Sequence, residues 1–214
     1  MRLVDHHELI AAWPAPTEAH PWPVLVSGCM LGWACGVDGT DMGLPAGLPA
    51  FVRSPRVKAV PFCPEDTGIG TPRGMPDIHG GDGFDVLDGR ARVLDEHGTD
   101  LTDGMLRGAH AMLARAQEAG VLFAVLLDMS GACGSQVISD GCRLVPDRRY
   151  QRGAGVATAL LMRHGIPVVS QRDRRTLEVL HARVEPGHAP DPGALDHHET
   201  AWVREHLPAP YRVR

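Results

Sequence analysis

The sequence predicts an α/β protein in which a mostly parallel sheet carries helices on both faces, a Rossmann-like three-layer sandwich. Two observations lead to this fold class. Short apolar runs alternate with helical periodicities along most of the 214 residues, and such alternation produces right-handed β-α-β crossovers. The run over residues 121–127 is apolar throughout, which is typical of a central strand buried on both faces. Since a chain of this length is usually built around one core, we expect a single α/β domain over residues 1–214.

The first half of the chain is expected to contain three strands and a long loop. An apolar run bounded by Pro23 and Gly28 predicts the first strand. In order, the expected elements are a strand at Val24–Ser27, a strand at Val57–Phe62, a Gly/Pro-rich loop over residues 64–90 and a short strand at Ala91–Leu94. The frequent Gly and Pro in that loop interrupt helical and strand patterns.

The second half begins with the clearest helix of the sequence. Apolar residues recur at helical spacing from Met105 to Ala116, Asp100 or Thr102 can cap this helix, and Gly120 ends it. Then follow the strand at Val121–Leu127, a loop with Cys133, a turn around Asp140-Gly141, a helix at Val156–His164 and a strand at Ile166–Ser170. Two further helices, around residues 172–183 and 194–206, form a C-terminal helical extension over residues 172–214.

The net charge of the chain argues against nucleic acids and acidic membranes as binding partners. The net charge is −5, and an acidic chain is poorly suited to a nucleic-acid backbone or an acidic membrane surface. The sequence contains neither the apolar stretch of a signal peptide nor a run long enough to cross a bilayer. We therefore expect a cytoplasmic protein that binds a small molecule. In that compartment the five cysteines should be free thiols or metal ligands rather than disulfides.

Three cysteines follow three of the predicted strands. Cys29 comes after the first strand, Cys63 after the second, and Cys133 a few residues after the apolar run at 121–127. In open parallel sheets ligands bind beyond the carboxyl ends of the strands, so these thiols can converge at one edge. Free cysteine is also among the residue types most often buried in a core, and no C-x2-C pair indicates a zinc or iron–sulfur motif. Position alone leaves both interpretations open.

A collinear series of motifs lies between residues 24 and 171, the family-like core. The series comprises residues 24–39 (VLVSGCMLGWACGVDG), Cys63-Pro64-Glu65, Thr71-Pro72-Arg73, Gly80-Gly81-Asp82-Gly83, Asp85-Val86-Leu87, residues 89–93, Gly108-Ala109, residues 130–135 and residues 153–156. Single pieces carry little information, but the ordered set is specific. It resembles the thiouracil desulfurase family.

The resemblance implies an enzyme with a 4Fe–4S cluster on three cysteines, which by motif are Cys29, Cys63 and Cys133. Three thiolates leave one iron open, and that iron can bind and polarise the thiocarbonyl sulfur of a thiolated pyrimidine or a related thioamide. Glu65 would activate a water as general base, and Ser130 would hydrogen-bond the substrate or relay a proton. The implied reaction is a net hydrolysis of C=S to C=O with release of sulfide. Cluster-assembly machinery is the implied protein partner.

The same motifs supply three further candidates for substrate contact. These are Arg73, Asp82 in the glycine loop, and Gly131 beside the serine. The chain also departs from the family pattern in two places. After Glu65, the family's Gly-Gly pair is replaced by Asp66-Thr67-Gly68-Ile69-Gly70. The usual Ser-Pro-Ser-Cys reads Ser130-Gly131-Ala132-Cys133, and acidic Asp128 replaces a lysine that is common just upstream.

Other potential metal ligands lie outside this set. Cys35, six residues from Cys29 on one loop, is the main alternative ligand, although a fourth thiolate would close the open iron. Cys142 is expected to be incidental. The string His197-His198-Glu199 could bind a metal, but adjacent residues on a helix point about 100° apart and share one ion poorly.

Two functions of other classes also stay open. Loss of proline and serine from the 130–133 loop favours a non-catalytic iron–sulfur protein that carries sulfide or senses oxygen or redox state. The other alternative is a metal-free α/β binding module with buried cysteines. Iron content and sulfide release from thiopyrimidines distinguish the three hypotheses.

Overall fold

The computed structural model describes residues 1–41 and 47–207. Its central sheet has four strands, all parallel. In spatial order they are β2 (Val57–Phe62), β1 (Trp22–Ser27), β5 (Phe123–Leu126) and β8 (Val168–Ser170). The predicted α/β fold with a mostly parallel sheet is therefore confirmed, because the four main apolar runs of the sequence are the four strands of this sheet.

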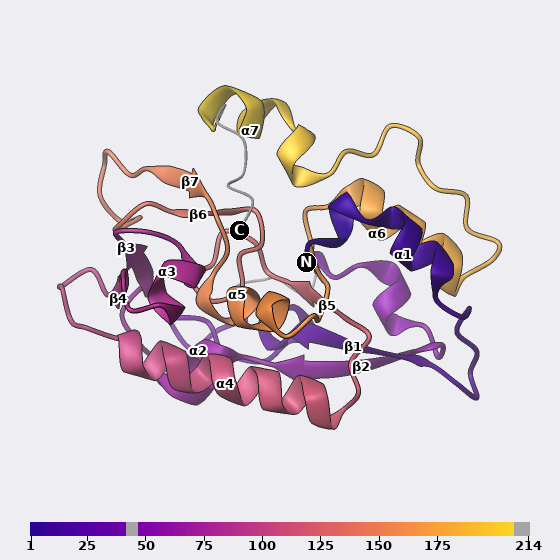
Figure 1. Cartoon of the computed structure of the whole chain (residues 1–214), viewed down its shortest axis with the longest axis horizontal. Helices are drawn as coiled ribbons and strands as arrows, with labels where there is room; N and C mark the ends of the chain where they lie inside the picture. Colours follow the sequence, from indigo (N-terminus) through magenta and orange to yellow (C-terminus); the bar gives the residue numbers. More distant parts are fainter. Residues whose placement is uncertain (42–46, 208–214) are drawn as a thin grey trace.

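Side chains of each strand alternate between two separate cores, as the period of two in a strand requires. The helices that cover the sheet are α1 (His7–Ala12), α4 (Thr102–Glu118), α5 (Val156–Arg163) and α6 (Arg174–Val184). Leu25 and Ala124 belong to the core under α4 and α5. Val24 and Phe123 belong to the core under α6 and the N-terminal segment. Figure 1 shows α4 on one side of the sheet and the α1–α6 pair on the other, so the fold has three layers.

The segment over residues 64–90, which we expected to be a loop, contains regular structure. It holds α2 (Pro64–Gly68), β3 (Asp77–His79) and α3 (Gly83–Leu87), and β3 pairs antiparallel with β4 (Arg92–Leu94). Elements of three to five residues are too short to show a period, which is why the prediction was wrong here. A second antiparallel pair, β6 (Val137–Ser139) with β7 (Tyr150–Arg152), encloses the predicted turn at Asp140-Gly141.

The C-terminal extension is less helical than predicted. Its second helix, expected over residues 194–206, is a 3-10 turn (η5, His197–Glu199) followed by α7 (Ala201–His206), with Thr200 between them as the N-cap. Trp202 of α7 packs edge-on against Tyr150 of β7, with ring centroids 5.6 Å apart. Residues 208–214 lie outside the described part of the chain. Within that part, no helix has both the length and the apolar character needed to cross a membrane.

Candidate active site

The carboxyl ends of β1 and β5 mark the point where the strand order reverses. β2 lies on one side of β1, whereas β5 and β8 lie on the other, and ligands of open α/β sheets bind in the crevice at such a switch point. The segments that leave β1, β2 and β5 carry Cys29, Cys63 and Cys133. The topology thus brings together the three cysteines that the sequence placed after separate strands.

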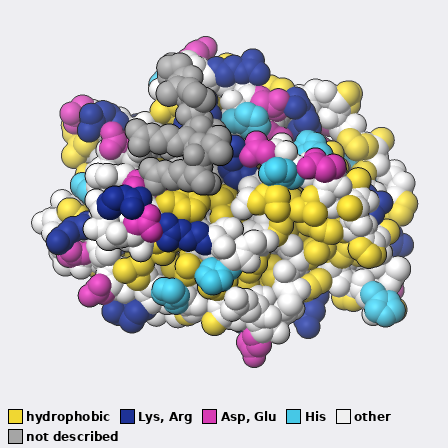
Figure 2. All heavy atoms as spheres, in the orientation of Figure 1, with side chains coloured by type: hydrophobic (Ala, Val, Ile, Leu, Met, Phe, Trp, Pro, Cys, Tyr) yellow, Lys and Arg dark blue, Asp and Glu magenta, His cyan; other side chains and the backbone are white. Residues whose placement is uncertain are grey.

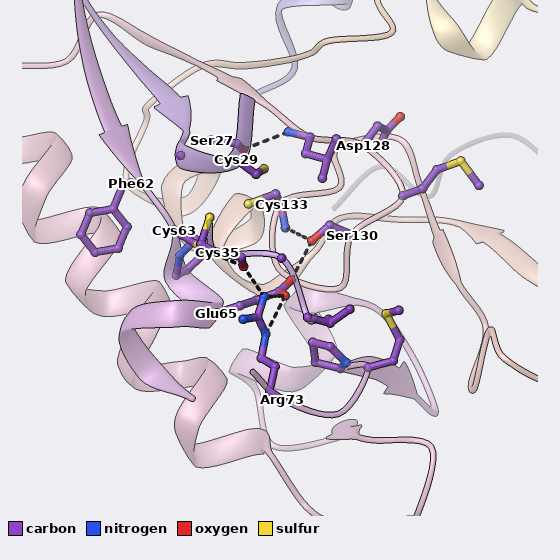
Figure 3. A pocket seen from close by; sticks show the side chains of 18 of the residues that line it. Ser27, Cys29, Cys35, Phe62, Cys63, Glu65, Arg73, Asp128, Ser130 and Cys133 are labelled. Carbon is purple, nitrogen blue, oxygen red and sulfur yellow. Dashed lines mark hydrogen bonds and ion pairs between the residues drawn. The ribbon is translucent and has the colours of Figure 1, made fainter. Parts of the chain in front are cut away.

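A cavity of about 240 Å³ lies at this edge of the sheet. Four cysteines line it: Cys29, Cys35, Cys63 and Cys133. Glu65, Arg73 and Ser130 line it as well, and Figure 3 shows the sulfur atoms and these polar groups gathered around one space. Most of the remaining wall is apolar and comes from Val37, Phe62, Met75, Pro76, Leu127 and Met129. The cavity therefore combines soft sulfur donors, the carboxylate of Glu65 and apolar walls, and Asp128 and Arg143 also line it.

Cys63 is positioned by the packing of α2 on α4. It is the N-cap of α2, and its Sγ accepts a hydrogen bond from the backbone N–H of Asp66 at 3.4 Å. A Cβ at Gly108 of α4 would lie 1.8 Å from the carbonyl oxygen of Pro64. Only glycine permits this approach of the two backbones, so Gly108 fixes the place of the segment that carries both Cys63 and Glu65.

The loop that carries Cys133 is held by its own serine. Ser130 Oγ accepts hydrogen bonds from the backbone N–H groups of Ala132 at 3.1 Å and Cys133 at 3.0 Å. Gly155 closes the other side, since a Cβ there would lie 2.4 Å from the carbonyl carbon of Ala132. Met129 has a φ of 61°, a left-handed conformation that costs energy for a side chain of this size and recurs at functional sites. The turn is therefore tightly constrained.

Burial and crowding disfavour negative charge on the thiols. Hydrogen bonding with the Cys29 thiol raises the pKa of Cys35 to about 11. Hydrogen bonding with Cys35, together with burial, raises the pKa of Cys63, and burial raises the pKa of Cys133. Three thiolates in this space thus require a cationic group among them. An all-sulfur donor set fits the iron of an iron–sulfur cluster and does not fit hard ions such as Mg²⁺ or Ca²⁺.

Glu65 is held at both carboxylate oxygens. Its Oε2 accepts hydrogen bonds from Nη2 of Arg73 at 2.7 Å and from Nε at 3.2 Å. Its Oε1 accepts a hydrogen bond from Ser130 Oγ at 3.0 Å. The two residues assigned to acid–base chemistry by the resemblance, 65 positions apart, are therefore in direct contact inside the cavity.

Arg73 supports this glutamate and has no donor left for a substrate. A guanidinium has five N–H groups. Two of them go to Glu65, and the other three have acceptors in the carbonyl oxygens of Gly70 and Cys35 and the hydroxyl of Thr71, at 3.0, 2.9 and 2.8 Å. The side chain is only 4% exposed. Arg73 was expected to contact the substrate, but its geometry is that of a residue that orients the carboxylate.

The other two expected substrate contacts lie outside the cavity lining. Asp82 is the N-cap of α3, where its Oδ1 accepts hydrogen bonds from the backbone N–H groups of Phe84 and Asp85. Gly131 packs against the backbone of Pro76, and a Cβ there would lie 2.6 Å from the Pro76 carbonyl oxygen. Both residues therefore have structural roles in the segments around the cavity.

Of the two remaining cysteines, the structure brings only Cys35 to the site. Cys35 is buried in the cavity wall, and its carbonyl oxygen accepts from Arg73. Cys142 lines a separate cavity together with His79 and Asp140. Cys35 thus stays the alternative ligand that its spacing suggested, whereas Cys142 is away from the four-cysteine group.

Sequence reasoning missed a buried histidine–aspartate hydrogen bond behind the cysteine loop. His197 Nδ1 hydrogen-bonds Asp128 Oδ2 at 2.6 Å, and the Asp128 side chain is fully buried. The neighbouring His198 Nδ1 has no hydrogen-bond partner among the described residues. Of the two histidines in the segment 197–199, His197 therefore hydrogen-bonds Asp128 and His198 does not. No local pattern marks this contact, because its two partners are 69 residues apart.

Convergent cysteines at a sheet switch point, with an oriented carboxylate beside them, define an α/β protein with a thiol-lined cavity whose donors suit a soft metal. The chain belongs to the 2-thiouracil desulfurase family, whose model matches residues 24–173, so the resemblance seen in the sequence is confirmed. It is 34% identical over 151 residues to the uncharacterized protein YbbK of Bacillus subtilis (strain 168), covering 70% of this chain and 96% of that protein. It is also similar to the solved structure of TudS, a [4Fe-4S]-dependent thiouracil desulfidase, with 34% identity and a TM-score of 0.54 over 70% of this chain and 90% of that one.

Proposed function

We propose that this protein removes sulfur from a thiolated pyrimidine such as thiouracil. In this proposal Cys29, Cys63 and Cys133 hold a 4Fe–4S cluster delivered by cluster-assembly machinery. The reaction consumes one water, converts C=S to C=O and releases one H₂S, so no external electron donor is needed. Family membership and the similarity to TudS support the proposal.

The contact between Glu65 and Ser130 is the observation that carries the proposal. A purely structural cysteine site does not need a carboxylate fixed at both oxygens beside its thiols. Here Arg73 and Ser130 hold the two oxygens of Glu65 at 2.7 and 3.0 Å. A general base must be oriented toward the atom that it deprotonates, and this arrangement orients Glu65 at the cavity wall.

The chemistry divides between the cluster and the chain. When bound through three thiolates, the cluster supplies an iron without a protein ligand, a Lewis acid suited to thiocarbonyl sulfur. Glu65 accepts a proton from the water that attacks the thiocarbonyl carbon. Ser130 donates its O–H to Glu65 Oε1, and its Oγ accepts hydrogen bonds from two backbone N–H groups. The hydroxyl can therefore pass a proton to or from Glu65 Oε1. Arg73 keeps the carboxylate from turning away.

The cavity walls favour a small flat substrate. Apolar residues such as Val37, Phe62 and Met75 form most of the surface around the sulfur atoms. The volume of about 240 Å³ is below the roughly 300–1,000 Å³ of sites for drug-sized ligands even before a cluster on the cysteines takes part of it, which suits a single ring better than a nucleotide. Basic and acidic side chains are interspersed over the face drawn in Figure 2. That mixture and the net charge of −5 are in keeping with a small-molecule partner rather than RNA.

A second candidate is a non-catalytic iron–sulfur protein that carries sulfide or senses oxygen. The presence of Cys35 in the same cavity favours it, because a fourth thiolate would occupy the iron that a substrate needs. The carbonyl of Cys35 is fixed by Arg73, but its thiol remains available beside the other three.

Sulfide release by the anaerobically reconstituted protein tests the proposal. We expect 2-thiouracil or 4-thiouracil to yield sulfide and uracil in equal amounts. Glu65→Gln should keep the iron content and lower turnover by about 10²–10⁴-fold, as loss of a general base does. A cluster-loaded protein that releases no sulfide from either thiouracil would favour the non-catalytic candidate, and full turnover by Glu65→Gln would contradict the assignment of the base.

A further inference from the structure

We propose that Glu178, His181 and His188 form a second metal site, for a divalent transition ion of the zinc class. Glu178 and His181 lie one turn apart on α6, so they share a face of the helix. His188 comes from the segment that follows α6. One donor atom from each of the three side chains lies within 4.8 Å of the other two.

Direct contacts already hold these three side chains together. His188 Nε2 and Glu178 Oε2 are 2.6 Å apart. The rings of His181 and His188 are stacked, with centroids 3.6 Å apart and planes 18° from parallel. The backbone N–H of Asp191 donates to Glu178 Oε2 at 3.2 Å, which ties the 188–191 segment to the helix. The group is therefore preassembled by two connections from the segment to one carboxylate.

The donor chemistry indicates the class of ion. Two imidazoles and one carboxylate suit Zn²⁺ and its neighbours, whereas Mg²⁺ and Ca²⁺ prefer oxygen ligands.

A turn of one imidazole out of the His181–His188 stack and a closer approach of the three donors would complete the coordination. In a tetrahedral zinc site with bonds of about 2.1 Å, donor atoms lie about 3.4 Å apart, whereas here they lie within 4.8 Å. Glu178 and His188 keep 19% and 26% exposure, which leaves room for their side chains to turn inward. The fourth position would be open to water. An ion held in this way would fasten the segment after α6 to the helix.

This site is independent of the cysteine cavity and of the proposed function. It uses no cysteine, and its residues lie beyond the 24–173 range of the family match. The cysteines must nevertheless be controlled for, because Zn²⁺ also binds thiolates. The test therefore uses cluster-loaded protein, in which Cys29, Cys63 and Cys133 are already engaged.

Zinc binding to the cluster-loaded protein, measured by calorimetry and by metal analysis after dialysis, tests the proposal. We expect one Zn²⁺ per chain, bound about 100-fold more weakly by His181→Phe and by His188→Gln. His181→Phe keeps a ring against His188, and His188→Gln keeps a donor for Glu178, so both should fold. His110→Gln, at an exposed position on α4, is the matched control and should bind zinc as the wild type does.

Zinc should also raise the Tm of the wild type and leave that of His181→Phe unchanged. Absence of zinc binding, or equal binding by the wild type and both site variants, would overturn the proposal.

Discussion

His197 of the C-terminal segment forms a buried hydrogen bond with Asp128, the residue that follows the central strand β5 by two positions. Oδ1 of the same aspartate accepts hydrogen bonds from the backbone N–H groups of Ser135 at 3.0 Å and Gln136 at 3.2 Å. Burial alone would raise the pKa of Asp128, but the hydrogen bond from His197 and those from the backbone hold it below its usual value. The C-terminal segment therefore stabilises the loop that carries Cys133.

Removal of the imidazole at His197 should destabilise the protein. Loss of the imidazole leaves one oxygen of the buried Asp128 carboxylate without its hydrogen bond, which costs about 1.5–3 kcal/mol. We expect His197→Ala to lower the unfolding free energy by about this amount and to reduce sulfide release, although His197 does not line the cavity. His198→Gln is the control, since His198 does not bond Asp128. Equal denaturation midpoints for His197→Ala and His198→Gln would contradict this role.

Asp173 should make stability depend on pH. Burial and the nearby charge of Asp128 raise its pKa well above the usual value. A raised pKa means that the folded state holds this proton more tightly than the unfolded state. Its stabilising contribution is thus complete below pH about 3.9 and is lost as pH rises through the raised pKa. Between pH 4 and pH 8 the Tm of the wild type should therefore fall relative to the Tm of Asp173→Asn. A constant difference would show that Asp173 is ionised throughout.

Arg73→Lys should lower kcat and leave KM nearly unchanged. A lysine keeps the charge but cannot grip Glu65 with two N–H groups, so we expect turnover to fall about 10–100-fold, as when a supporting residue is lost. Iron content should not change. The matched control is Arg107→Lys, which alters an exposed arginine of α4 that bonds the carbonyl of Gly68. A large rise in KM would instead mean that Arg73 contacts the substrate.

Serine substitutions at Cys35 and Cys63 should have different effects on the iron content of the protein. Both thiols lie in the cavity wall, but in our account only Cys63 binds iron. Cys35→Ser should retain the iron and the electron paramagnetic resonance spectrum of the reduced cluster, whereas Cys63→Ser should lose iron. A changed spectrum in Cys35→Ser would identify Cys35 as a fourth ligand and favour the non-catalytic candidate.

The sequence allowed the sheet and the cysteine group to be predicted because both depend on local signals. The apolar runs before Cys29 and Cys63 are the strands β1 and β2, and a parallel sheet necessarily brings their carboxyl ends to one edge. The helix over residues 102–118 was visible from its period for the same reason.

The parts that could not be predicted depend on contacts between distant segments. The helix α2 has only five residues, and it is positioned by the close approach of Pro64 to Gly108 rather than by its own propensity. The role of Arg73 became clear only from its acceptors, two of which are the carboxylate of Glu65 and the carbonyl of Cys35. The Asp128–His197 contact joins the core to the C-terminal extension, and neither residue carries a sequence signal for the other.

The amount of iron and acid-labile sulfide bound per chain after anaerobic reconstitution tests the three-cysteine cluster directly. We expect about four of each in the wild type and a common loss of both in Cys29→Ala, Cys63→Ala and Cys133→Ala. Values near zero in well-folded wild-type protein would contradict the three-cysteine cluster, and with it the proposed desulfuration.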